Sequence, residues 1–309
     1  MMLSRVAERL YWMARYLERS EGTARLVNAF SLFVLDIPKG MEPGWDALVR
    51  TFDAQASFAE RYSKATERNT ISFLLSDKSN HCALRHSVRS ARENVRTTRD
   101  VLPRFAWELM NELHLLVDTR ARHAVARGNR REFLDRVIGM NQQFNGLLDS
   151  TVTRDQAFWF IRLGGLLERC DMTSRIVDVA ATSMGEKLNG PIPGAPLLGS
   201  NLLQSLSATS AYRRSVGPII ASDDVIDFVL KSPNFPRSMI FCLNSIEETV
   251  ALLKAPAGML RQIRAMAKSI GNVDTSDEAR PELHARIDDF QADLGELHES
   301  IAERWFAIA

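Results

Sequence analysis

The chain has 309 residues, of which 45% are hydrophobic and 25% charged, and its formal net charge is +1. This is the composition of a globular protein with a sizeable core, which excludes a disordered or collagen-like chain. A chain so close to neutrality neutralises nucleic-acid phosphates poorly, so we expect no nucleic-acid partner.

The cysteines and the uncharged segments indicate a cytoplasmic protein. Cys82, Cys170 and Cys242 are odd in number, and none lies in CxxC spacing. Neither a disulfide framework nor a zinc site is therefore expected, and a reducing compartment is favoured. The N-terminal residues are charged and have no apolar core segment, so no signal peptide is expected. The longest uncharged stretch, residues 188–212, is rich in proline and glycine and indicates a linker rather than a membrane span.

Helical periodicity runs through the whole chain, and alternating strand patterns are nearly absent. We therefore predict an all-α fold, a bundle of long antiparallel helices. In chain order, the predicted helices span residues 3–35, 44–62 and 66–76 (both regions as short helices), 80–102, 104–126, 130–150, 153–184, 202–216, 223–231, 237–254, 257–271 and 281–307.

Local signals place several of the helix ends. Pro38 should stop the first helix and Gly128 should close the helix over residues 104–126. Thr153, with Gln156 three residues later, forms a capping-box pattern at the start of the next long helix. The glycine- and proline-rich segment 185–201 is predicted to be a linker.

An octapeptide with one charge pattern occurs twice, as ERSEGTAR at residues 18–25 and ERCDMTSR at residues 168–175. An aromatic-rich segment precedes each copy, and an apolar turn follows it. We interpret the chain as a single domain, 1–309, with an internal duplication. Its two halves, about 1–150 and 151–309, would be related by a pseudo-two-fold axis.

Each copy places an acid on the apolar side of its helix, with an arginine four residues later. In the first copy Glu21 projects within roughly 20° of Leu10, Arg25 follows one turn on, and Glu18 flanks both. The second copy repeats this register with Glu168, Asp171 and Arg175. An unpaired carboxylate on an apolar face costs several kcal/mol, so each acid must be paired, protonated or turned toward a wet pocket.

Two interpretations of these charges remain open. They form either a buried ion-pair network that sets the helix register or a polar pocket between the repeats that holds a ligand. In both, Arg25 supplies the charge that Glu21 needs, so Arg25→Ala should destabilise by a few kcal/mol. Arg19 is expected on the outer face of the helix, so Arg19→Ala should cost little.

Five arginines form a second constellation, directly beside the apolar stripe of the predicted helix 80–102. They are Arg85, Arg89, Arg92, Arg96 and Arg99. One interpretation is a solvated face whose arginines pair with acids of neighbouring helices, and the other is an anion-binding wall. Arginine outnumbers lysine 32 to 7 in the chain, which fits either codon bias or a use of arginine for bidentate contacts with carboxylate or phosphate.

The common catalytic motifs are missing. The sequence contains no phosphate-binding loop, dinucleotide fingerprint, nucleophile elbow or HExxH zinc motif. The six histidines show no i,i+4 spacing to one another. We therefore expect no metal and no cofactor, and no catalytic residue is assigned.

Several segments together resemble the bacterial Alpha-E family, over essentially the whole chain. They are MLSRVAERLYWMARYLERSEGTAR near the start, ARENVRTTRD at residues 91–100, RLGGLLERCDMTSRI at residues 162–176 and FPRSM at residues 235–239. This all-helical family is typically encoded beside a circularly permuted ATP-grasp protein. A transglutaminase-like protein is often encoded nearby.

The resemblance implies a role beside an ATP-grasp-type ligase that makes or attaches peptides. The family signature falls on residues of both octapeptides and of the middle motif. The ligand-binding residues that it implies here are Glu18, Glu21, Arg25, Arg92, Arg96, Glu168, Asp171 and Arg175. The chain departs from the family pattern at Gly165, where an arginine matching Arg15 is usual, and at Arg9, where asparagine is usual. The two half-sites are therefore not expected to be equivalent.

Three functions from different classes follow. The first is a partner of the ligase that binds an acidic peptide, amino acid or phosphorylated intermediate in a charged groove between the repeats. The second is a scaffold whose charges only lock helix packing. The third, with the least support, is a stand-alone enzyme with Glu18 or Glu168 as general base.

Overall fold

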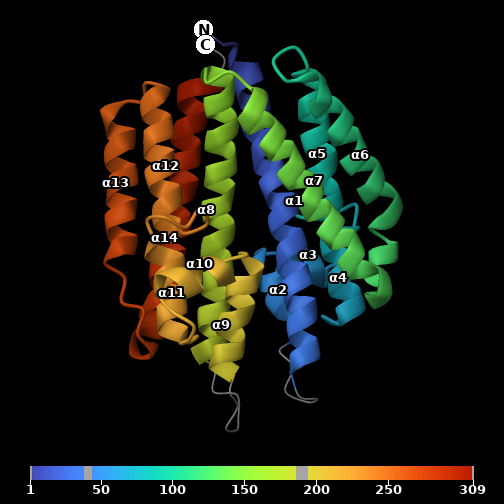
Figure 1. Cartoon of the computed structure of the whole chain (residues 1–309), viewed down its shortest axis with the longest axis vertical. Coiled ribbons are helices and arrows are strands. Elements are labelled where there is room, and N and C mark those ends of the chain that lie inside the picture. Colours follow the sequence, from blue (N-terminus) through green and yellow to red (C-terminus); the bar gives the residue numbers. More distant parts are fainter. Residues whose placement is uncertain (1, 38–43, 186–193, 308–309) are drawn as a thin grey trace. The chain divides into compact units, whose positions relative to one another are not determined.

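The computed structural model describes residues 2–37, 44–185 and 194–307, and every element of regular structure within these ranges is a helix (Figure 1). The predicted all-α fold is therefore confirmed. The helices before residue 152 are α1 (Ser4–Asp36), α2 (Asp46–Thr51), α3 (Gln55–Ala59), α4 (Glu67–Leu75), α5 (Leu84–Thr97), α6 (Arg104–Arg120) and α7 (Arg127–Thr151). Those that follow are α8 (Gln156–Gly185), α9 (Gly194–Ser205), α10 (Thr209–Ser215), α11 (Ser222–Lys231), α12 (Met239–Leu252), α13 (Ala257–Gly271) and α14 (Arg280–Trp305).

The chain divides into two compact units, each built from segments that are distant in the sequence. Unit 1 comprises Met1–Asn28, Gly44–Glu168 and Ile301–Ala309, and unit 2 comprises Ala29–Pro43 and Arg169–Ser300. Three of the four boundaries fall inside helices, namely α1, α8 and α14. This division does not coincide with the two sequence halves, and the internal duplication stays a prediction.

In unit 1 three consecutive helices pack in chain order, α5 against α6 and α6 against α7 (Figure 1). The apolar stripe of α5 forms one side of this packing, because Leu84, Val88, Ala91 and Val95 are all fully buried. In unit 2, α12 packs against α13, and α11 contacts α9, α12 and α13.

The first and last described residues belong to unit 1 and lie beside each other (Figure 1). The backbone N–H of Met2 donates to the side-chain oxygen of Gln156 at 2.9 Å. The ring of Phe306 lies 5.2 Å from that of Tyr11 and 6.0 Å from that of Phe160. Phe306 therefore helps to cover the region where α1 and α8 meet.

Two helix boundaries differ from the predicted ones for local reasons. The predicted helical region 44–62 contains the two short helices α2 and α3, which are separated at Asp53. Its φ of 49° is a left-handed conformation that no right-handed helix can contain. Gly128 does not follow a helix but lies in the first turn of α7, where one glycine costs only about 1 kcal/mol relative to alanine.

The N-terminus of α8 also differs from the prediction. Helix α8 begins at Gln156, and the cap is Asp155 instead of Thr153. The Asp155 carboxylate accepts a hydrogen bond from the backbone N–H of Ala157 at 2.9 Å. A carboxylate at this position satisfies an N–H that has no acceptor within the helix.

The predicted linker over residues 185–201 is described only in part. Residues 186–193 lie outside the described residues, as does Pro38, which was expected to stop the first helix. From Gly194 the chain is helical, as α9. Pro196 falls in the first turn of α9, where backbone N–H groups have no intrahelical acceptor, so proline is tolerated there.

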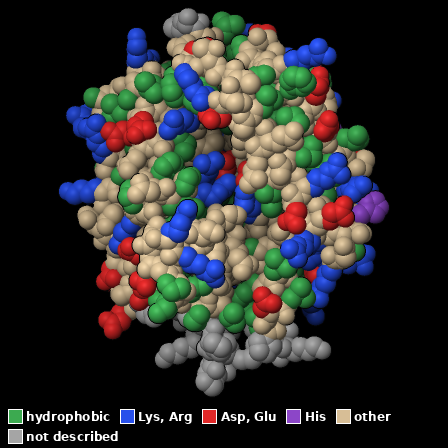
Figure 2. Space-filling model, viewed as in Figure 1, with side chains coloured by type: hydrophobic (Ala, Val, Ile, Leu, Met, Phe, Trp, Pro, Cys, Tyr) green, Lys and Arg blue, Asp and Glu red, His purple; other side chains and the backbone are tan. Residues whose placement is uncertain are grey.

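Basic and acidic side chains are interspersed over the face of the molecule drawn in Figure 2. Among the described helices, none combines the length and the apolar character that crossing a membrane requires.

Helices α1 and α8 come into backbone contact within unit 1. A Cβ atom added at Gly164 of α8 would lie only 2.2 Å from the carbonyl oxygen of Tyr11 on α1. Glycine is therefore required at this position by space and not by backbone conformation. The neighbouring Gly165 differs, because a Cβ there would meet nothing within 4 Å.

The two adjacent glycines provide a matched test of this crossing. Gly164→Ala should lower the free energy of unfolding by about 1–3 kcal/mol, because the added methyl group forces the two helices apart. Gly165→Ala should leave it unchanged or raise it by up to about 1 kcal/mol through the better helix propensity of alanine. Urea denaturation followed by circular dichroism measures both. Equal stability of the two variants would show that the crossing tolerates a side chain.

Candidate functional site

The carboxylate of Glu168 is buried between two arginines of α1. Arg15 Nε donates to Oε2 of Glu168 at 2.8 Å. Arg19 donates through Nε to Oε1 at 2.5 Å and through Nη2 to Oε2 at 3.0 Å. The side chain of Glu168 is 0% exposed, against 10% for Arg15 and 20% for Arg19. We call these three residues the Glu168 cluster.

The helix crossing explains why these residues meet. Arg15 lies four residues after Tyr11 on α1, and Glu168 lies four residues after Gly164 on α8. Residues four apart share one face of a helix, so both side chains lie one turn beyond the backbone contact. The absence of a side chain at Gly164 therefore brings the carboxylate within reach of Arg15.

Aromatic rings surround the cationic side of the cluster. The Arg15 guanidinium lies 4.9 Å from the centre of the Trp12 ring, and that of Arg19 lies 5.8 Å from the centre of the Tyr16 ring. Arg15 Nη1 also donates to the hydroxyl oxygen of Tyr11 at 3.4 Å. The cluster has two guanidinium groups and one carboxylate. Because ring faces stabilise a desolvated cation, the aromatic rings stabilise the second positive charge.

Burial and charge act in opposite directions on these groups. Burial raises the pKa of Glu168, but the charges and hydrogen bonds of Arg19 and Arg15 outweigh it and hold that pKa below its ordinary value. Burial also raises the pKa of the Tyr11 hydroxyl, to about 12. Glu168 is therefore ionised and Tyr11 neutral at neutral pH, and a carboxylate already bonded to two arginines makes a poor general base.

The remaining octapeptide acids pair within their own helices. Arg25 Nη2 donates to Oε1 of Glu21 at 2.6 Å, and the Glu21 side chain is only 3% exposed. Arg175 Nε donates to Oδ1 of Asp171 at 3.0 Å. Both i,i+4 pairs expected from the sequence are thus confirmed. Glu18 is buried as well, at 3% exposure.

The expectation for Arg19 is wrong. It is not on a solvated outer face but donates two hydrogen bonds to the buried Glu168. The helical wheel assigned one buried face to α1, whereas in unit 1 this helix is buried almost all round. A helix buried on every side must carry its polar groups in the interior. Arg15 was missed for the same reason, although three aromatic residues, Tyr11, Trp12 and Tyr16, lie next to it in the sequence.

Of the five arginines in the predicted helix 80–102, three contact side chains of α6. Four of the five lie on α5, and Arg99 follows its last residue. Arg85 pairs with Asp118 of α6, and Arg92 Nε donates to the side-chain oxygen of Asn111 at 2.7 Å. Arg92 and Arg99 both lie 5.1 Å from the centre of the Trp107 ring. The other two arginines have no partner on α6 among the described residues. Arg96 pairs with Glu93 of α5 at 2.9 Å, and Arg89 is exposed. Arg92 and Arg96, both expected to bind a ligand, thus have protein partners.

A cavity of about 290 Å³ lies at one end of this α5–α6 seam. Its lining consists of three cations, two imidazoles and two carboxylates: Lys78, Arg85, Arg89, His86, His114, Asp77 and Asp118. We call it the α5–α6 cavity. Burial lowers the pKa of both histidines, and nearby cations, including Arg89, lower it further. Both imidazoles are therefore neutral at neutral pH, in a positive local potential.

Neither of these clusters gathers a set of metal ligands. In the described part of unit 1, no three histidine, cysteine, aspartate or glutamate side chains converge as ligands. Each acid of the α5–α6 cavity already pairs with an arginine, Asp77 with Arg61 at 3.2 Å and Asp118 with Arg85. An anion is the ligand that the cavity's charges favour.

Removing one arginine from Glu168 should be costly. Arg19→Ala should lower the free energy of unfolding by about 2–4 kcal/mol, because two charge-assisted hydrogen bonds to a buried carboxylate are lost. Arg104→Ala is the control, since Arg104 also pairs with a glutamate but is 90% exposed. It should change stability by less than about 0.5 kcal/mol. If urea unfolds both variants at the same concentration, Glu168 does not depend on Arg19.

Glu168 should also make stability depend on acid pH. Its pKa is lower in the folded chain than in the unfolded chain, where it is about 4.3. The stability that it contributes is thus present above about pH 4.3 and is lost as the pH falls through the folded pKa. Glu168→Gln should reduce stability at neutral pH, yet flatten its decline below about pH 5. Glu108→Gln, at an exposed glutamate, controls for the loss of any one carboxylate, and a Glu168→Gln profile parallel to the wild-type one would contradict the prediction.

Comparison with known proteins identifies the family of the chain. Residues 2–306 match the model of the Alpha-E family, which is described as a predicted α-helical domain with a conserved ER motif. Glu18–Arg19 and Glu168–Arg169 are the Glu–Arg pairs of the two octapeptides. No curated protein and no solved structure matches the chain. Because the family model matches nearly every residue, the protein belongs to the Alpha-E family.

Proposed function

We propose that the chain is the helical partner of an ATP-grasp-type amide or peptide ligase and that it binds an anionic group of the ligase's substrate in the α5–α6 cavity. The anion is a carboxylate or an acyl-phosphate of an acidic peptide or amino acid. The observation that carries this proposal is the excess of cations lining a cavity of about 290 Å³. The link to the ligase comes from the resemblance to the Alpha-E family, and a transglutaminase-like protein encoded nearby would act in the same system.

Only some of the charged side chains that line the cavity form ion pairs within the protein. Arg85 is held by Asp118, and Asp77 is held by Arg61. Lys78 and Arg89 are exposed and form no ion pair with any described residue. Two unpaired cations beside two neutral imidazoles offer both charge and hydrogen-bond donors, which is what a carboxylate or phosphate requires.

The chemistry of such ligases suits a cationic partner. They pass through acyl-phosphate intermediates, whose negative charge needs cations and whose hydrolysis must be prevented. Arg89 would bind the anion directly, and Lys78 would add a second positive charge. The chain itself would supply no nucleophile in this scheme.

We place the ligand at this cavity and not at the repeated octapeptides. The carboxylates of Glu21, Glu168 and Asp171 each accept hydrogen bonds from arginine. A ligand there would have to displace a bonded arginine from a buried acid, which costs several kcal/mol.

The second candidate function is the scaffold. The observation that favours it is the complete burial of Glu168 between two arginines, which orders α1 against α8 without any ligand. The two candidate functions differ in whether the exposed cations of the α5–α6 cavity bind an anion.

Both can be tested with one set of variants. The tagged chain is expressed with the neighbouring ATP-grasp protein and purified, and binding of acetyl phosphate and of L-glutamate is measured by calorimetry. The wild-type chain should retain the ligase and bind at least one of the two probes. Arg89→Ala should weaken probe binding about tenfold or more, since a hydrogen bond to a charged group contributes about 1.5–3 kcal/mol. Arg104→Ala, which removes an exposed arginine of α6 outside the cavity, should not.

The outcomes separate the candidates. Retention of the ligase without binding of either probe, or equal probe affinity in Arg89→Ala and Arg104→Ala, would favour the scaffold. Failure of the ligase to co-purify would contradict the partnership itself.

A further inference from the structure

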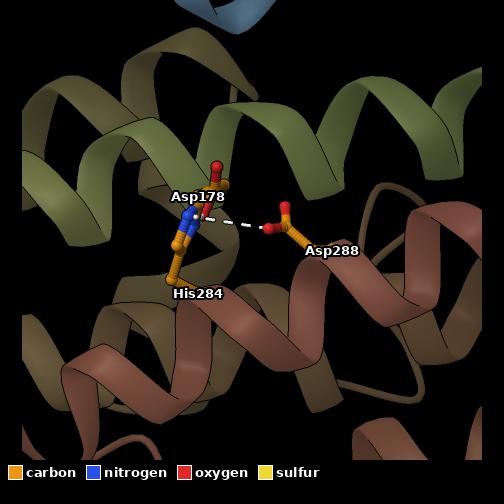
Figure 3. A group of neighbouring side chains, drawn as sticks. All are labelled: Asp178, His284 and Asp288. Carbon is orange, nitrogen blue, oxygen red and sulfur yellow. Dashed lines mark hydrogen bonds and ion pairs between the residues drawn. The ribbon is translucent and has the colours of Figure 1, made fainter.

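Three potential metal ligands meet in unit 2, between α8 and α14 (Figure 3). Asp178 comes from α8, and His284 and Asp288 come from α14. Nδ1 of His284 lies 2.6 Å from Oδ1 of Asp178, and Nε2 lies 3.6 Å from Oδ2 of Asp288. One ligand atom from each residue can be chosen so that all three lie within 4.8 Å of one another.

The register of α14 explains this convergence. His284 and Asp288 are four residues apart, so both lie on one face of the helix. Each directly follows a buried residue, Leu283 and Ile287 respectively, that belongs to the core. The two polar side chains therefore lie at the edge of the buried face, where they point toward Asp178 of α8 (Figure 3).

We propose that Asp178, His284 and Asp288 bind a divalent first-row transition metal ion, with Zn²⁺ as the preferred species. One imidazole nitrogen and two carboxylate oxygens are ligands that Zn²⁺ accepts, at about 2.0–2.2 Å each. Ligand atoms at such distances from one ion lie roughly 3.3–3.5 Å apart in tetrahedral geometry. The two measured separations involve different ring nitrogens of His284, and one ion is bound by only one of them. One ligand atom from each residue lies within 4.8 Å of the other two, so the carboxylate that faces the other nitrogen must rotate toward the ion.

The charges of the group favour a cation. Two carboxylates share one imidazole, and the nearby Arg175 is already bonded to Asp171 at 3.0 Å. Asp178 is only 18% exposed, so little water is available to solvate its carboxylate. A divalent ion would balance the negative charge of the two carboxylates.

The imidazole decides which cation is preferred. Mg²⁺ and Ca²⁺ take oxygen ligands, whereas a nitrogen ligand suits zinc and its neighbours in the first row. His284 and Asp288 are 54% and 59% exposed, so an ion can reach the group from solvent. Three protein ligands leave a fourth position open for water or for a group of a bound molecule, as in catalytic zinc sites.

The test is calorimetric titration of ZnCl₂ into the full-length chain after treatment with a chelator. We expect saturable binding of one Zn²⁺ per chain at this site. His284→Ala and Asp288→Asn should each weaken it at least about tenfold, since even loss of an outer-sphere partner costs 10–100-fold. Asp289→Asn and His123→Ala are the matched controls. They remove the same groups from exposed positions outside the triad and should leave the affinity unchanged.

A second measurement keeps the test independent of any effect on folding. Co²⁺ bound by the wild-type chain should show visible absorption bands of a nitrogen- and oxygen-ligated ion, and these should be lost in His284→Ala while its circular dichroism stays that of the wild type. The proposal is overturned if the wild-type chain binds no Zn²⁺. It is equally overturned if His284→Ala binds Zn²⁺ as tightly as the wild type, since His284 would then not be a ligand. Equal affinity for Mg²⁺ and Zn²⁺ would also overturn it, because the group would then not select an ion that prefers nitrogen.

Discussion

The carboxylate of Glu168 is fully buried, and the arrangement of α1 and α8 in unit 1 follows from how it is accommodated. Removing a carboxylate from water costs several kcal/mol, which only well-directed cations can offset. Arg15 and Arg19 direct three N–H groups at its two oxygens. This requires the helices to lie close together, and Gly164 permits that by presenting no side chain to the carbonyl oxygen of Tyr11. The ion pairs of Glu168 therefore depend on the glycine at position 164.

The two octapeptides have the same sequence pattern but different chemical roles. Arg19, the arginine of the first Glu–Arg pair, binds the glutamate of the second pair. Arg169, the arginine of the second pair, donates instead to the backbone carbonyl of Pro236 at 3.4 Å in unit 2. Position 15 holds the arginine that completes the Glu168 cluster, whereas the matching position of the second copy holds Gly165. A repeated motif thus serves one asymmetric cluster.

The structure separates charges that are bonded inside the fold from charges that are exposed and unpaired among the described residues. The octapeptide acids Glu21, Glu168 and Asp171 are bonded to arginines and are buried or half-buried. Lys78 and Arg89 at the α5–α6 cavity are exposed and unpaired among the described residues. A bonded, buried charge contributes to stability and register, while an exposed, unpaired one costs little to keep and is ready to bind an anion. The proposed anion binding and the helix packing therefore involve different residues.

The sequence by itself determined what depends on local spacing. The helical period of 3.6 residues was enough to predict the helices and the pairs Glu21–Arg25 and Asp171–Arg175, because i,i+4 neighbours meet in any helix. The partner of Arg19 lies 149 residues away, and no local rule connects the two positions. The meeting of Asp178 with His284, 106 residues apart, likewise depends on how α8 and α14 pack. Such contacts were decided only by tertiary structure, since burial on every side of a helix and the close approach of two backbones arise from packing and not from periodicity.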